Sequence, residues 1–202
     1  MKGDIHMSTY ELARQKTKHS IIMAFWNLYT DKEIDKITVR SITEQAGIHR
    51  ATFYLHFDHV YAILDCIKDT QLSAVRYVCT NYTSSENNYA DFLCAMQKLY
   101  TENELFLKPL LCEYRDSGFA MECRRILKEK LQKDIGLPLF SKNSANYFVI
   151  DSFLSGLIET FISCLHTKKI PLEQAYLLAS GIVNEGALIT LQKHFNIKTM
   201  PF

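Results

Sequence analysis

Residues 49–56, HRATFYLH, place a guanidinium, hydroxyl groups, imidazoles and small side chains within about two helical turns. Phe53 and Phe57 lie four residues apart, so a helix here would bury both rings on one side. Arg50 and Tyr54 would then face outward, where their donors could contact bases and phosphates. This chemistry favours a surface that binds nucleic acid.

A second short helix precedes this stretch and would position it. Thr38 can cap that helix, and Ile42 and Ala46 share its inward face. Gly47 follows where the helix must end, and a left-handed residue at a helix end is most easily glycine. Two short helices joined by a glycine turn predict a helix-turn-helix, whose second helix, residues 49–56, reads the DNA major groove. On spacing alone, an ordinary helical corner is the alternative.

Residues 38–57, TVRSITEQAGIHRATFYLHF, closely resemble the DNA-binding signature of the tetracycline-repressor (TetR-like) family. The resemblance extends over residues 8–66, and its motif residues are Thr38-Val39, Ile42, Ala46-Gly47-Ile48, Thr52-Phe53-Tyr54 and His56-Phe57. It implies an all-α fold of about nine helices, with an N-terminal three-helix helix-turn-helix DNA-binding head joined by a long helix to a helical ligand-binding and dimerisation domain. Where the family usually has a phosphate-binding lysine at the start of the next helix, this chain has Val60, and His59 is a possible substitute.

The candidate DNA contacts divide into side chains that read bases and side chains that fix the register on phosphates. Arg50 is the best candidate for a bidentate contact to guanine, which discriminates between bases by about 1–3 kcal/mol. Ala51 and Thr52 would meet a base edge or a thymine methyl group, and hydroxyl and imidazole groups would bind phosphates. The complete predicted set is Thr38, His49, Arg50, Ala51, Thr52, Tyr54, Leu55, His56 and His59.

Composition excludes several classes of protein. Hydrophobic residues make up 48% and charged residues 22% of the 202 residues, which are ordinary globular values. Seven glycines and four prolines are too few for the many turns of an all-β sandwich. No apolar run reaches the ~18–20 residues that span a bilayer, and the first residues lack a secretory signal. We therefore expect a cytoplasmic protein with no membrane partner.

Charge gives only weak support for nucleic-acid binding. The net charge is +1, and residues 1–60 contain eight Lys and Arg against seven Asp and Glu. Any DNA affinity must therefore come from a local surface, with little contribution from attraction by the whole molecule.

Catalytic and metal-binding patterns are weak. The sequence has no glycine-rich phosphate loop, H-E-x-x-H, G-x-S-x-G or spaced acidic cluster, so we expect no enzyme activity, no cofactor and no metal. Six cysteines lie widely apart without a C-x-x-C pair and are expected to be reduced and buried. His56 and His59 have H-x-x-H spacing, but Asp58 would break the helix between them and no third ligand is evident.

The predicted organisation is a DNA-binding domain over residues 1–57 and an effector-binding and dimerisation domain over residues 58–202. A long helix over residues 58–83, capped by Asp58, would connect the two. The first helix would begin with a capping box of Ser8 and Glu11 and end near Thr30, with Leu12 on its buried side. Further helices are expected over residues 89–101, 104–115, 119–135 and 143–167, and from about residue 171 onward.

The last two expected helices are apolar around more than half of their circumference. Such helices can bury one side internally and the other against a twin chain, which predicts a two-fold dimer through a four-helix bundle. A helix that is simply central in a larger core is the alternative. The predicted dimer interface contains Phe153, Leu157, Phe161, Tyr176, Ser180 and Val183.

By resemblance, the region from about residue 89 to 165 would hold an effector pocket between helices. The side chains expected to line it are Phe92, Met96, Tyr100, Phe106, Tyr114, Phe148 and Phe161. A Met and aromatic stripe at helical spacing is more often core, so each of these residues has that alternative. The apolar character of the set suggests an apolar or aromatic ligand.

Together these features predict a sequence-specific transcriptional regulator of the TetR-like type, acting as a repressor. A homodimer would bind a near-palindromic double-stranded operator with half-sites about 34–36 Å apart, or a multiple of that. By resemblance, a small-molecule effector would release or modulate it by changing the separation of the two heads. The alternative is a coactivator-type regulator whose C-terminal domain binds a protein partner.

Overall fold

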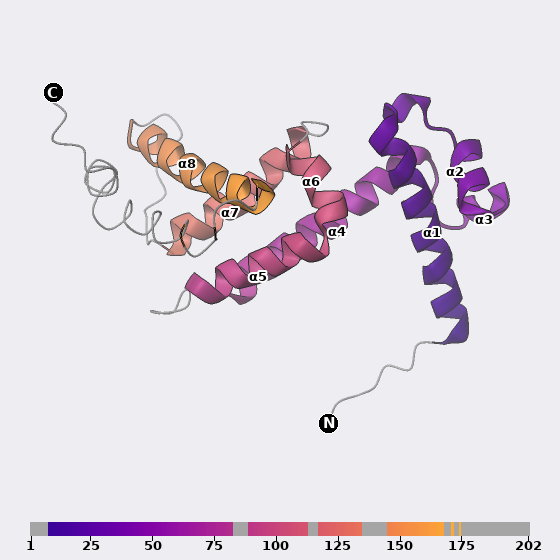
Figure 1. Cartoon of the computed structure of the whole chain (residues 1–202), viewed down its shortest axis with the longest axis horizontal. Helices are drawn as coiled ribbons and strands as arrows, with labels where there is room; N and C mark the ends of the chain where they lie inside the picture. Colours follow the sequence, from indigo (N-terminus) through magenta and orange to yellow (C-terminus); the bar gives the residue numbers. More distant parts are fainter. Residues whose placement is uncertain are drawn as a thin grey trace, which may run out of the picture. The chain divides into compact units, whose positions relative to one another are not determined.

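The computed structural model describes residues 8–82, 89–112, 117–134 and 145–167, with Pro171 and Gln174 as isolated positions. Helices make up nearly all of these ranges and no strand occurs within them, so the predicted all-α fold is confirmed (Figure 1). The helices are α1 (Thr9–Asp31), the 3-10 helix η1 (Ile34–Lys36), α2 (Val39–Ala46), α3 (Arg50–Tyr54), α4 (Val60–Asn81), α5 (Tyr89–Glu102), α6 (Glu104–Cys112), α7 (Ser117–Asp134) and α8 (Ala145–Thr167). Within these ranges no helix is long and apolar enough to cross a membrane. Apart from the two isolated positions, the last predicted helix lies outside the described residues.

Two compact units divide the chain between Thr70 and Gln71. Unit 1, Met1–Thr70, contains α1, η1, α2, α3 and the first half of α4. Unit 2, Gln71–Phe202, contains the rest of α4 and the helices α5 to α8. Helix α4 therefore continues without a break from one unit into the other.

The core of unit 1 is built on α1. Ser8 caps this helix as the sequence predicts, because its side chain accepts a hydrogen bond from the Glu11 amide at 3.2 Å. Ile21, Phe25 and Trp26 are fully buried. Each such side chain stabilises the fold by about 1.5–3 kcal/mol through the apolar surface that it removes from water.

Helix α2 packs against α1 (Figure 1), and the Ser20 hydroxyl donates a hydrogen bond to the Ala46 carbonyl at 3.5 Å. Leu12 was expected on the buried side of α1, but 44% of its surface is exposed, so this expectation is wrong. Leu12 lies more than two helical turns before Ile21, the first buried residue of α1. Helical periodicity predicted which face of α1 is buried. It did not predict how far along that face other helices cover α1.

Unit 2 contains α7 packed against α6 and α8, and Figure 1 shows α7 and α8 lying side by side. The apolar side of α7 is buried at Phe119, Cys123 and Leu127. Its polar side is tied to neighbouring helices by ion pairs, which include Arg76–Glu122 to α4, and Arg124–Glu159 (3.0 Å) and Lys128–Asp151 (2.6 Å) to α8. Contacts on both sides therefore fix the position of α7 within unit 2.

Candidate nucleic-acid interface

The turn between α2 and α3 has the backbone geometry that the sequence predicts. Thr38 and Ser41 form a capping box at the start of α2, in which each side chain accepts a hydrogen bond from the other's amide at 3.1 Å. At the end of α2, Gly47 is left-handed, with φ 66° and ψ 36°. The amides of Gly47 and Ile48 both donate to the Thr43 carbonyl, that of Ile48 at 3.1 Å. This turn sets the direction in which α3 leaves α2.

Helix α3 is shorter than the helix predicted over residues 49–56. Regular helix covers only Arg50–Tyr54, because the chain must then turn to begin α4 at Val60. The amide of Phe57 still donates to the Phe53 carbonyl at 3.0 Å. Phe53 is fully buried and Phe57 nearly so, with ring centroids 6.2 Å apart. These two rings anchor the short helix in unit 1, as their spacing indicated.

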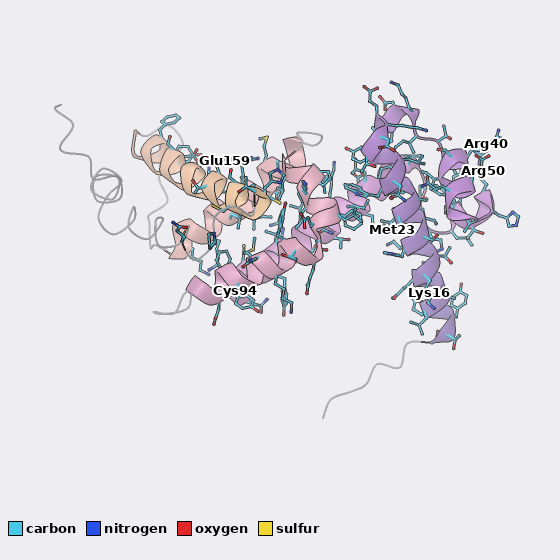
Figure 2. All side chains as sticks on the ribbon, viewed as in Figure 1. Lys16, Met23, Arg40, Arg50, Cys94 and Glu159 are labelled. Carbon is cyan, nitrogen blue, oxygen red and sulfur yellow. The ribbon has the colours of Figure 1, made fainter. Side chains whose placement is uncertain are left out.

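The predicted DNA contacts lie around this buried anchor on the surface of unit 1. Arg50, Tyr54 and Leu55 are exposed, and Leu55 is 75% exposed although its side chain is apolar. In the view of Figure 2, Arg40 and Arg50 both lie on the side of the α2–α3 pair that faces away from α1. The remaining predicted contacts are Thr38, His49, Ala51 and His59, which are exposed, and Thr52 and His56, which are half-buried.

Arg50 and Tyr54 form a pair on the exposed side of α3. The tyrosine hydroxyl accepts hydrogen bonds from Nη2 of Arg50 at 3.1 Å and from Nε at 3.4 Å. The guanidinium carbon lies 5.6 Å from the centre of the Tyr54 ring, within the range of a cation–π contact. The four-residue spacing brings the two side chains together on one helical face. These contacts hold the Arg50 guanidinium against Tyr54, one helical turn further along α3.

His56 lies beside two cations of α1. Burial, followed by the charges of Arg14 and Lys18, lowers the pKa of the His56 imidazole below its ordinary value. The imidazole is therefore neutral at pH 7, where it can accept or donate a hydrogen bond. The Lys18 ammonium lies 5.6 Å from the centre of the Phe57 ring. Arg14 and Lys18 thus form a pair of cations beside His56, in a unit with almost no net charge.

His59 has a structural role at the start of α4. Its Nδ1 atom accepts a hydrogen bond from the Ala62 amide at 3.1 Å, which satisfies one of the free donors of the first turn. The prediction that Asp58 caps this helix is therefore wrong, because α4 begins at Val60 and the cap position falls on His59. Val60, at the family's lysine position, is half-buried.

Tyr61 is a polar surface residue of unit 1 that the sequence reasoning missed. Its hydroxyl donates a hydrogen bond to the Asp35 carboxylate of η1, and 48% of the residue is exposed. That hydrogen bond, with burial and the charge of Asp35, raises the pKa of the Tyr61 hydroxyl. The sequence signal that could have identified Tyr61 is its aromatic hydroxyl, which directly follows Val60 in the first turn of α4.

Unit 2 has a small, partly open apolar cavity of about 30 Å³. Of the predicted effector-pocket residues, Met96 and Tyr100 line it, and Phe92 is buried on the same face of α5. The full lining is Val75, Met96, Leu99, Tyr100, Leu107, Leu111, Cys123, Leu127 and Ile162. Five helices contribute to this lining, from α4 to α8.

The other predicted pocket and dimer residues do not line this cavity or are not described. Phe106 is half-buried, and Phe148 is 62% exposed near the start of α8. Phe153, Leu157 and Phe161 belong to α8, but their side chains lie outside the described part of the chain. Tyr114, Tyr176, Ser180 and Val183 also lie outside it.

Comparisons with known proteins identify the fold. No protein-family model matches the sequence, and no curated protein matches it. Among solved structures, a TetR transcriptional regulator from Streptococcus agalactiae aligns with a TM-score of 0.60 and 21% identity, over 86% of this chain and 97% of that chain. A TetR-family transcriptional regulator from Haemophilus influenzae aligns with a TM-score of 0.52 and 14% identity, over 89% and 97%. The resemblance seen in residues 38–57 is therefore confirmed at the level of the fold.

Proposed function

We propose that this chain is a sequence-specific DNA-binding transcriptional regulator of the TetR-like type, acting in the cytoplasm as a repressor and without enzyme activity. The observation that carries this proposal is the geometry of α2 and α3. Left-handed Gly47 joins two short helices, and the second presents Arg50 and Tyr54 outward while Phe53 is fully buried behind them. The fold shared with TetR-family regulators supports the same function.

In this proposal α3 enters the major groove of the operator. Arg50 binds the O6 and N7 atoms of a guanine through its two parallel donors, while Ala51 and Thr52 meet a base edge or a thymine methyl group. Phosphate contacts come from Thr38, Tyr54 and His56, with His49, Leu55 and His59 at the edges of the interface. The exposure of Arg50 and Tyr54 and the two cations Arg14 and Lys18 beside His56 support these roles.

A single head has too little charge to bind DNA tightly. Residues 1–60 have an excess of only one basic residue, eight against seven. Two heads acting together would double the number of contacts without new chemistry, so we propose that a homodimer binds a near-palindromic operator. Its interface would be formed by α8 and the segment that follows, through Phe153, Leu157, Phe161, Tyr176, Ser180 and Val183.

Control of binding would come from unit 2. A ligand that enters the helix packing around Met96 and Tyr100 would change how the helices pack, and so change the affinity for the operator. The apolar cavity of about 30 Å³ shared by five helices supports this location, because several helices must respond when it is filled.

Selection of bound DNA from a random pool tests the proposal. The full chain should enrich a near-palindromic sequence that carries a guanine in each half-site. Enrichment of a single unpaired half-site would contradict the homodimer. Failure to enrich any sequence, with a folded protein, would contradict DNA binding itself.

A further inference from the structure

The first half of α1 is not buried by the rest of unit 1. The buried residues of α1 begin at Ile21, and every residue from 9 to 20 is exposed or half-buried. Residues 9–20, which we call the α1 extension, correspond to about 18 Å of helix. In the view of Figure 2, Lys16 lies on this part of α1, beyond α2 and α3. The α1 extension therefore has surface free for a partner.

The α1 extension is more basic than the unit to which it belongs. It contains Arg14, Lys16 and Lys18 against a single glutamate, whereas residues 1–60 together have an excess of only one basic residue. All three cations are exposed. No described acidic side chain forms an ion pair with any of them, whereas Lys36 and Arg40 are each paired with a glutamate, at 3.0 and 2.7 Å. The charge of the α1 extension is thus available to an anionic partner.

Arg14 and Lys18 lie on the side of α1 that faces the helix-turn-helix. They are four residues apart, so they share one helical face. The Lys18 ammonium is 5.6 Å from the centre of the Phe57 ring. Burial and then the charges of Arg14 and Lys18 lower the pKa of the His56 imidazole, so both cations lie near it. Lys16 is about 200° around the helix from either cation and lies on the opposite side.

The surface proposed to bind the operator therefore continues from His56 onto α1. We infer that the α1 extension lies along the DNA backbone, with Arg14 and Lys18 on phosphates outside the base pairs that α3 reads. The inference deepens the proposed function and rests on it. The length of the α1 extension, about 18 Å, corresponds to about five base pairs of duplex.

Contacts of this kind supply affinity but no sequence information, because phosphates are the same at every position. Each phosphate that a cation neutralises releases counterions, and the logarithm of the binding constant then falls with the logarithm of the salt concentration. The slope is about 0.9 for each phosphate contact. Each cation occurs twice in a homodimer, so removing it should lower the slope by about two.

Salt titrations of the full chain with the selected operator and with unrelated DNA test the inference. Arg14→Gln and Lys18→Gln should each weaken binding to both DNAs by a similar factor and lower the salt slope by about two. Both residues are exposed, so neither substitution should affect folding. Lys18→Arg keeps the charge and should keep the wild-type slope.

The matched control is Lys16→Gln. It removes the same charge from the same exposed segment but from the opposite side of the helix, so the salt slope should stay close to that of the wild type. This control separates a contact at a defined place from an effect of the total charge.

Replacing single phosphates by neutral methylphosphonates locates the contact on the DNA. At the phosphate bound by Arg14, the replacement should weaken binding of the wild type but cause no further loss in Arg14→Gln. The same should hold for Lys18→Gln at a second phosphate. Both phosphates should lie outside the base pairs that selection enriches.

A wild-type salt slope in Arg14→Gln or Lys18→Gln would overturn the inference and leave the proposed function standing. An equal fall in slope for Lys16→Gln would also overturn it, because the total charge would then explain the effect. Loss of affinity for the operator alone would assign the two cations to base reading instead. A folded wild-type chain that binds no DNA would overturn the proposed function and this inference with it.

Discussion

In unit 1 the charged and hydroxyl side chains of α3 lie on the surface around buried Phe53, whereas in unit 2 Lys130 lies inside the helix packing. The exposed set is positioned by backbone geometry within a few residues, namely the left-handed Gly47 and the capping box of Thr38. The buried lysine is positioned by contact with Phe92, which is distant in the sequence.

This difference separates two kinds of variant. Substitutions on the surface of α3 should change DNA binding with little effect on folding, since exposed residues away from special features contribute little to stability. Substitutions in the packing of either unit should change stability first.

The largest effect is expected from Phe53→Ala. Phe53 is fully buried, and truncating a buried phenylalanine costs about 3–5 kcal/mol of unfolding free energy. Trp26 is the single tryptophan of the chain and is fully buried in unit 1, so its fluorescence reports the unfolding of that unit. The neighbouring variant Leu55→Ala, at a residue that is 75% exposed, should change the free energy of unfolding by no more than about 0.5 kcal/mol. Similar losses of unfolding free energy in both variants would contradict the distinction between the exposed residues around α3 and its buried anchor, Phe53.

A smaller effect is expected from Gly47→Ala. A Cβ atom there would have no neighbour within 4 Å, so the cost comes from the left-handed backbone alone. That cost is about 1–2 kcal/mol for an L-residue. Gly47→Asn is the matched control, because asparagine tolerates this conformation better. Trp26 fluorescence during urea unfolding should rank the stabilities as wild type, Asn, Ala; an alanine variant as stable as the wild type would show that the turn does not require glycine.

The smallest effect is the pH dependence that comes from His56. Because the pKa of its imidazole is lowered in the folded chain, the neutral form is favoured there. The resulting stability is present above the unfolded pKa of about 6.5 and is lost as the pH falls through that value towards the folded pKa. Operator phosphates would instead favour the charged form, so DNA binding should take up a proton and strengthen as the pH falls.

Titrations of the selected operator between about pH 8 and pH 6 at fixed ionic strength measure this dependence. The operator affinity of the variant His56→Gln should depend less on pH than that of the wild type. An unchanged pH dependence in His56→Gln would remove His56 from the phosphate contacts.

The features of unit 1 that could be predicted are those encoded within a few residues. Gly47 and Thr38 satisfy the backbone at the ends of α2, and the spacing of Phe53 and Phe57 fixes which side of α3 is buried. The features that were missed depend on neighbouring elements. The exposure of Leu12 depends on how far other helices extend along α1, and the cap at His59 depends on where the chain turns into α4.

In unit 2 the sequence indicated helices but not their contacts. Residues 122–134 are rich in charge and resemble a solvated face, yet Lys130 among them is buried against α5. Phe148 lies in an apolar stretch and is exposed in the single chain. Periodicity gives the direction of a side chain around its own helix, whereas burial depends on which helix lies opposite. Which helix lies opposite depends on pairings between distant segments, and one sequence does not reveal these pairings.

The central claim is that α3 reads bases through Arg50, and a paired binding measurement tests it most directly. Affinities of Arg50→Ala and of Arg40→Ala, an exposed arginine on α2, are compared for the selected operator and for unrelated DNA. We expect Arg50→Ala to lose about 1–3 kcal/mol of binding free energy per half-site on the operator and much less on unrelated DNA. Arg40→Ala should lose equally little on both. Equal losses on both DNAs for Arg50→Ala would contradict the claim that Arg50 reads the sequence.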